Sequence, residues 1–255
     1  MPMLIVKRIV FTLVVSFLVG CVTVTDKPNT AKFDNIKASE ARISLGLGYL
    51  EEGNMIKARE NLEMAVKYAP SYYRALNSVA YYYQKVGENE LAEQAYEDAL
   101  DSSPKNGDVL NNYGAFLCRQ GEYEKADEFF NRAIEQPYYY LVAASYENAG
   151  LCSLKSGNEE KAAAYFSRAL DHDPGRARSL LQLAELEIEK DKFSDARVRL
   201  FKFNKRYGYR PVSLGLLIKL EHKDNNSELV SKYGDILKTK YPDSIQYQKY
   251  RQNEY

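Results

Sequence analysis

The stretch NNYGAFLCRQGEYEKADEFFNRA, residues 111–133, carries the pattern from which the fold of this chain is predicted. It divides at Gly121, the residue type that most readily adopts the positive φ of a tight turn between two helices. Gly114 before the turn and Ala126 after it are small, as residues must be where two helices cross closely. Phe130 is placed to fill the space beside them. The stretch therefore predicts a pair of antiparallel helices.

The pattern recurs along the chain with a period close to 34 residues. The small residue of each second helix lies at Ala58, Ala92, Ala126, Ala162 and Ala196, in steps of 34, 34, 36 and 34. The residue of each turn is glycine, or an aspartate or asparagine that also tolerates a positive φ, at Gly53, Gly87, Gly121, Gly157, Asp191 and Asn225. Prolines stop the helix pairs at Pro70, Pro104, Pro174 and Pro242. These markers predict an array of helix pairs.

Six copies of the unit begin near residues 39, 73, 107, 143, 177 and 211. The sixth keeps apolar residues but lacks the marker glycine and alanine, as terminal repeats of an array often do. The pattern resembles the tetratricopeptide repeat, whose first helix carries L-G-x-x-Y; residues 45–49 read LGLGY. The resemblance implies an all-α, right-handed superhelical solenoid of about six repeats of antiparallel helices over residues 39–242. Residues 243–255 are predicted to be a C-terminal tail.

The start of the chain has the pattern of a secretory signal. Lys7 and Arg8 precede an apolar run of eleven residues at 9–19, which is too short to span a bilayer as a stable helix. Residues 1–20 are therefore predicted to be a signal peptide, and LVGC at 18–21 closes the apolar run. A soluble signal peptide with a chance cysteine and an uncut anchor are the alternatives.

The LVGC sequence resembles the bacterial lipobox, which implies that Cys21 is acylated and becomes the first residue of the mature protein. Val22 follows in place of the aspartate that retains lipoproteins on the inner membrane in enteric-type sorting, so the resemblance implies the outer membrane. Residues 21–38 are polar, lack a helical apolar stripe and are predicted to form a lipidated tether. Apart from the covalent lipid, no cofactor is expected.

Composition and motifs argue against several function classes. The 35 basic and 35 acidic residues balance, so no basic excess indicates a nucleic-acid partner. The phosphate-loop and zinc-protease motifs are absent from the sequence. The two histidines, His172 and His222, lie 50 residues apart in different repeats, and no cysteine–histidine cluster has metal-binding spacing. We therefore expect neither an enzyme nor a small-molecule substrate.

Two cysteines remain besides Cys21. Cys118 and Cys152 fall at positions twelve and ten of the first helices of repeats three and four. First helices of neighbouring repeats pack side by side, and the cell envelope is oxidising, so the two residues are predicted to form a disulfide. The alternative is a pair of buried free thiols that pack as small apolar side chains.

First helices line the concave face of such arrays, and this face predicts where a partner binds. In the first repeat, its expected inward positions carry three aliphatic residues that the packing of the repeat itself does not require. Polar groups of the next two repeats would position the partner. The predicted partner-binding groove comprises Ile43, Leu47, Leu50, Asn77, Tyr81 and Asn111. The alternative is that the N-terminal tether covers these aliphatic side chains.

Two stretches go beyond the generic repeat. These are NNYGAFLCRQG at 111–121 and ENAGLC at 147–152, because the repeat pattern requires neither the cysteines nor the asparagine pair. Together with the lipobox, they resemble the PilF/PilW family of type IV pilus biogenesis lipoproteins. The resemblance implies a monomeric pilotin on the outer membrane of a Gram-negative bacterium, facing the periplasm. It would bind the secretin PilQ, bring it to the outer membrane and promote its multimerisation, although some members act in pilus stability.

Two other functions stay open at this point. One is a general envelope scaffold for another outer-membrane assembly machine. The other is a chaperone adaptor of the carboxylate-clamp type, which needs basic and asparagine side chains at fixed groove positions. Ile43 and Leu47 occupy the matching sites in repeat one, so the clamp is disfavoured.

Overall fold

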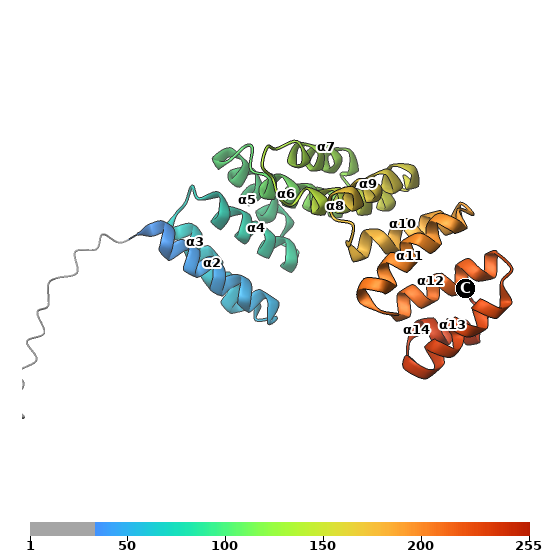
Figure 1. Cartoon of the computed structure of the whole chain (residues 1–255). Coiled ribbons are helices and arrows are strands. Elements are labelled where there is room, and N and C mark those ends of the chain that lie inside the picture. The colour runs from blue at the N-terminus through green and yellow to red at the C-terminus, as the bar shows by residue number, and fades with distance from the viewer. Residues whose placement is uncertain (1–33) are drawn as a thin grey trace, which may run out of the picture. The chain divides into compact units, whose positions relative to one another are not determined.

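A computed structural model describes residues 34–255 of the chain, and Figure 1 shows their helices in order. Residues Asn35–Tyr255 form one compact unit. The predicted signal peptide, Cys21 and most of the predicted tether lie outside the described residues. The helices of the described part are α2 (Asn35–Glu51), α3 (Met55–Tyr68), α4 (Tyr73–Val86), α5 (Asn89–Ser102), α6 (Gly107–Gln120), α7 (Tyr123–Ile134), α8 (Val142–Lys155), α9 (Glu159–His172), α10 (Ala177–Glu189), α11 (Phe193–Tyr207), α12 (Pro211–Lys223), α13 (Ser227–Lys240) and α14 (Ile245–Arg251).

The helices pack as six successive pairs, from α2 with α3 to α12 with α13. Contacts also join the first helices of neighbouring pairs, as between α2 and α4, α4 and α6, α6 and α8, and α10 and α12. The described residues contain helices and no strand. The predicted all-α array of antiparallel helix pairs is therefore confirmed.

The marker residues of the repeat lie where the sequence places them. All five second-helix alanines are completely buried. A Cβ added to Gly114 would lie 3.1 Å from the carbonyl oxygen of Ala126 and 3.1 Å from the ring of Phe130, so the two helices cross closely there. The six predicted turn residues have positive φ values, at Gly53, Gly87, Gly121, Gly157, Asp191 and Asn225.

The two ends of the array differ from the prediction. At the N-terminus, α2 begins at Asn35, so residues 35–38 are helical and do not belong to a tether. At the C-terminus, the predicted tail at 243–255 contains the helix α14. Its first turn is stabilised by Ser244, whose Oγ accepts a hydrogen bond from the backbone N–H of Tyr247 at 3.2 Å.

Helix α14 continues the register of the repeats. Its first residue, Ile245, follows Pro211 of α12 by 34 residues, and Pro211 follows Ala177 of α10 by 34 residues. Helix α14 packs against α12 and α13. A Cβ added to Gly234 of α13 would lie 2.1 Å from the ring of Tyr250. The absence of a side chain at Gly234 therefore allows α14 to pack closely against α13. Helix α14 therefore takes the place of the first helix of a seventh repeat.

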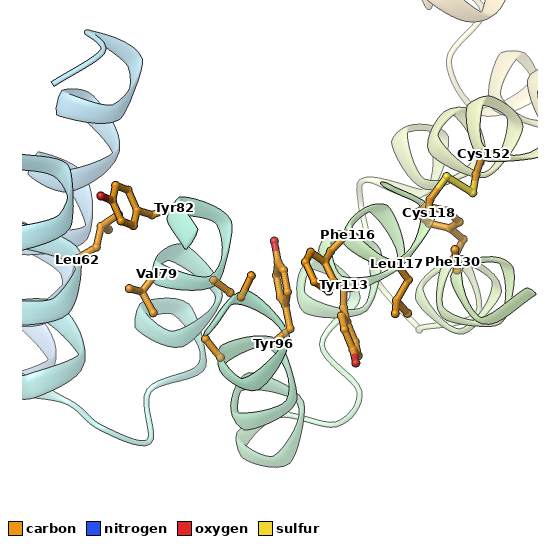
Figure 2. Packing of buried hydrophobic residues seen from close by; sticks show 14 of the residues in the cluster. Leu62, Val79, Tyr82, Tyr96, Tyr113, Phe116, Leu117, Cys118, Phe130 and Cys152 are labelled. Carbon is orange, nitrogen blue, oxygen red and sulfur yellow. A yellow bond between two sulfur atoms is a disulfide. The ribbon is translucent and has the colours of Figure 1, made fainter. Parts of the chain in front are cut away.

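An apolar core runs through repeats one to four without interruption (Figure 2). It includes a stack of Tyr96 on Tyr113, whose ring centroids lie 5.5 Å apart. At its far end, α6 and α8 are joined by a disulfide between Cys118 and Cys152, with an S–S distance of 2.11 Å and a Cα–Cα distance of 5.8 Å. This is the pair predicted from the sequence, and it links the first helices of repeats three and four.

A buried ion pair links repeats four and five. The carboxylate of Glu147 in α8 accepts hydrogen bonds from Arg176 at 3.0 and 3.1 Å and from the Oγ of Ser179 at 2.7 Å. Only 8% of Glu147 is exposed. Burial alone would raise the pKa of Glu147, but the donors on Arg176 and Ser179 outweigh it and lower this pKa. The ionised carboxylate therefore stabilises the junction of α8 with α10.

Removal of the disulfide is expected to destabilise the protein. In the chain-entropy view, a cross-link over 34 residues stabilises the folded state by about 3–4 kcal/mol. The variant Cys118→Ala/Cys152→Ala should lose about this free energy of unfolding in urea titrations, because alanine avoids burying a new hydroxyl. Mass spectrometry of non-reduced digests of the wild type should find the linked peptides. Two freely alkylated thiols in the native protein would contradict this prediction.

Loss of the Glu147 charge is expected to weaken the array in a pH-dependent way. Because the folded-state pKa is lowered, the stabilisation is complete above the unfolded-state pKa of about 4.3 and is lost as the pH falls through the folded-state value. At pH 7, Glu147→Gln should lower the free energy of unfolding by about 2 kcal/mol. The exposed Glu135→Gln serves as the control. A Glu147→Gln defect of the same size at pH 7 and at about pH 3 would exclude this electrostatic role.

Candidate protein-binding groove

A groove lies between the first helices of repeats one and two. Its volume is about 610 Å³. Helix α2 and the start of α3 form one side, α4 forms the other, and α6 contributes to one end. The residues that line it are Leu47, Leu50, Glu51, Met55, Asn77, Ser78, Tyr81, Lys85 and Asn112. We call this surface the N-terminal groove.

The helical period explains why these side chains share one face. Leu47 and Leu50 of α2, like Ser78 and Tyr81 of α4, are three residues apart and therefore lie on one side of their helix. Leu47 and Leu50 are half-buried, since part of each also packs against the core of repeats one to four. At the start of α3, Met55 is 41% exposed. The groove therefore offers aliphatic, thioether and aromatic surface to a partner.

Polar groups surround this apolar surface. The Asn112 side chain donates a hydrogen bond to the Asn77 side chain at 3.3 Å, which links α6 to α4 at one end of the groove. The Lys85 ammonium lies 5.3 Å from the centroid of the Tyr81 ring. Glu51 is the one carboxylate among the lining residues. Apolar anchors flanked by amides and one charge of each sign suit a peptide segment with apolar side chains.

The structure places four of the six predicted groove residues, Leu47, Leu50, Asn77 and Tyr81, in this groove. The predictions for the other two are wrong. Ile43 is only 4% exposed and packs against Ala65 and Ala75. Asn111 is 8% exposed.

Asn111 has a structural role within the array. Its Oδ1 accepts hydrogen bonds from Ser145 at 2.9 Å and from Asn148 at 3.0 Å, both in the next first helix. In both cases the neighbouring repeat covers the residue, because Ala75 of α4 packs against Ile43, and Ser145 and Asn148 of α8 bond with Asn111. Asn77, at the same position five of repeat two, stays in the groove.

The groove predicted from the sequence lacks five of the lining residues, Glu51, Met55, Ser78, Lys85 and Asn112. Three of them have a simple signal, because they lie three or four places from a predicted groove residue on the same helical face: Glu51 follows Leu47 by four, Lys85 follows Tyr81 by four, and Ser78 precedes Tyr81 by three. Asn112 has no such signal. Met55 has none, since it lies beyond the turn at Gly53.

The described residues hold no cluster of three or more side chains able to bind a metal ion. Across residues 34–255, no helix has the length and apolar character needed to cross a membrane.

Comparison with known proteins agrees with this architecture. Sequence profiles of the tetratricopeptide repeat match residues 73–106, 107–174 and 153–202. The type IV pilus assembly protein PilF of Pseudomonas aeruginosa strain PAO1 is 35% identical over 245 residues, which cover 95% of this chain and 96% of that protein. An uncharacterised protein of Haemophilus influenzae is 40% identical over 116 residues, 46% of this chain and 65% of that protein.

Two solved structures share the fold over most of the chain. The structure of Pseudomonas aeruginosa PilF has a TM-score of 0.74 and 33% identity, and the match covers 86% of this chain and 99% of that one. PilW, described as a widely conserved type IV pilus biogenesis factor, also has a TM-score of 0.74, with 26% identity over 83% of this chain and 97% of that one. The identity to PilF over nearly the whole length of both chains shows that this chain belongs to the PilF/PilW family of tetratricopeptide repeat proteins.

Proposed function

We propose that this protein acts in type IV pilus biogenesis as a pilotin. It binds the secretin subunit, a PilQ-like protein, on its way through the periplasm, brings it to the outer membrane and promotes its multimerisation. The observation that carries the proposal is the similarity to a type IV pilus assembly protein along 95% of this chain and 96% of that protein. Similarity over the full length supports a shared role of the whole array, where a match to one repeat would support only the fold.

The N-terminal groove supplies a physical basis for binding. Burying an aliphatic or aromatic side chain contributes about 1.5–3 kcal/mol before the ordering costs of association are subtracted. Leu47, Leu50, Met55 and Tyr81 together provide several such contacts on one surface. We assign binding and positioning to the groove, and no chemical reaction on a substrate.

The proposal includes a lipid anchor at Cys21, supported by the lipobox-like LVGC sequence. A diacylglyceryl thioether and an N-acyl chain place more than one hydrocarbon chain in the bilayer. Each buried methylene adds about 0.8 kcal/mol, and stable anchoring requires more than one chain. The pilotin would thus face the periplasm from the outer membrane while the repeats bind the secretin.

Charged substitutions in the N-terminal groove are expected to weaken secretin binding. Leu47→Asp/Leu50→Asp should raise the Kd for the purified secretin at least about tenfold and reduce secretin multimers in cells, because two apolar contacts are lost. Ile36→Asp/Leu45→Asp is the matched control, since both residues lie on α2 outside the groove and are 45% and 51% exposed. Binding is measured by titration calorimetry.

Folding of the variants is monitored by circular-dichroism melting, because Leu47 and Leu50 also touch the core. Met55→Asp is a second test at an exposed groove position and should weaken binding without a change in Tm. If a folded Leu47→Asp/Leu50→Asp variant and Met55→Asp both bind secretin with wild-type affinity, the site lies elsewhere on the protein.

Replacement of the proposed lipidation site is expected to release the protein from the outer membrane. Cys21→Ser cannot form the thioether, so the variant should take up no labelled palmitate and should leave the outer-membrane fraction. Cys118→Ser, which changes a cysteine within the array, is the control and should remain lipidated. Continued palmitate labelling and outer-membrane fractionation of Cys21→Ser would refute the lipid anchor.

A further inference from the structure

A second and larger cavity lies among the last three first helices, α10, α12 and α14. Its volume is about 900 Å³, and it shares no lining residue with the N-terminal groove. The size is within the range of about 300–1,000 Å³ that binding sites occupy. We call it the C-terminal groove. It exists because α14 continues the 34-residue register and adds a third wall to the surface formed by α10 and α12.

The floor and the mouth of the C-terminal groove are apolar. Leu216 and Phe203 are buried in the floor, where Leu181 is half-buried. At the mouth, Val212 is 42% exposed and Ile245 is 57% exposed. Large exposed aliphatic side chains beside an open cavity are typical of surfaces that bind another molecule.

A glycine keeps this groove open. Leu181 of α10, Gly215 of α12 and Lys249 of α14 are equivalent positions of three successive repeats, because each follows the last by 34 residues. All three residues line the cavity. A Cβ on Gly215 would lie 3.0 Å from the Cγ of Gln246, and any longer side chain would enter the space between the helices. The last described residues, Asn253, Glu254 and Tyr255, form part of the wall.

The charges of the C-terminal groove indicate the chemistry of its occupant. Three cations line it, Arg178, Lys219 and Lys249, one from each first helix, against the carboxylates of Glu185 and Glu254. Within residues 34–255, Lys219 forms an ion pair with Glu189, whereas Arg178 and Lys249 form no ion pair.

The position of these cations along the helices matters. Arg178 and Val212 occupy position two of their repeats, and Leu181 and Lys249 occupy position five. Glu185 occupies position nine. One end of the groove therefore combines apolar side chains with two cations that form no ion pair, and the charge of Arg178 also acts on the nearby Glu147 carboxylate. A carboxylate beside an apolar anchor complements that end, while a basic side chain would be repelled.

We propose that the C-terminal groove is a second protein-binding site, which takes an apolar segment of a protein partner that carries aspartate or glutamate residues. The apolar side chains of the segment lie over Leu181, Val212 and Ile245, and its carboxylates lie next to Arg178 and Lys249. This site is separate from the N-terminal groove and does not depend on whether the secretin is the partner there.

The test selects the occupant from an unbiased pool of peptides. A phage-displayed random peptide library is panned on the full-length protein, with counter-selection on Val212→Glu/Ile245→Glu, whose substituted residues are exposed. Selected peptides should combine apolar residues with aspartate or glutamate. One labelled peptide and its version with lysine in place of the acids are then compared by fluorescence anisotropy. The acidic peptide should bind about tenfold more tightly, and Arg178→Glu/Lys249→Glu should remove or reverse this preference.

Two controls separate this site from others. Lys202→Glu/Lys205→Glu changes two exposed cations of α11 outside the groove and should leave the affinity within about twofold, as should Leu47→Asp/Leu50→Asp in the N-terminal groove. The proposal is overturned if no peptide is selected, if the selected peptides are basic, or if Arg178→Glu/Lys249→Glu binds like the wild type. It is also overturned if sedimentation shows a dimer that Val212→Glu/Ile245→Glu dissociates, because the occupant would then be a second copy of this chain.

Discussion

The close crossing of the two helices within each repeat is the constraint on which the rest of this structure depends. At position eight of the first helix, a Cβ on Gly150 would lie 2.8 Å from the Phe166 ring, and one on Gly46 would lie 2.5 Å from the Leu62 side chain. The alanines of the second helices are fully buried in the same crossings. Because the interior of a protein is closely packed, these contacts leave little freedom in how the two helices are arranged.

Successive hairpins then stack through their first helices, and this stacking decides which residues are left for partners. In repeats one, three and four, the residue at position five packs against the start of the next first helix, whereas Asn77 of repeat two lines the N-terminal groove. Asn111 bonds with Ser145, and Glu147 bonds with Ser179, so both polar residues hold neighbouring repeats together. Leu47 and Tyr81, at position nine, remain accessible in the N-terminal groove. In α2, the same geometry thus separates Ile43, which packs between repeats, from Leu47, which lines the groove.

Much of this could be predicted from the sequence because it rests on local rules. A turn that needs a positive φ selects glycine, asparagine or aspartate, and a close crossing selects glycine or alanine, so both leave a regular mark every 34 residues. Asp191 and Asn225 were predicted as turn residues on this ground, and their φ values are 54° and 59°. The stacking of neighbouring repeats leaves no comparable mark, which is why Ile43 and Asn111 were misassigned.

The seventh first helix was missed for a related reason. Position eight of that repeat is Gln252, the residue after α14, and no helix of the described residues crosses it. Without a crossing, no small residue is required, so the marker that identifies a repeat is absent. The compensating signals are Gly215 and Gly234 in the sixth repeat, which give space to Gln246 and Tyr250. Their meaning depends on contacts that only the folded chain reveals.

If this member of the PilF/PilW family acts on the secretin, as we propose, the amount of assembled secretin in the outer membrane depends on it. The gene is deleted, and secretin multimers are measured in separated inner- and outer-membrane fractions, with twitching motility scored in parallel. We expect that multimers disappear from the outer membrane, that secretin monomers accumulate elsewhere, and that the wild-type gene restores assembly. Unchanged secretin multimers in the outer membrane of the deletion strain would contradict this proposal.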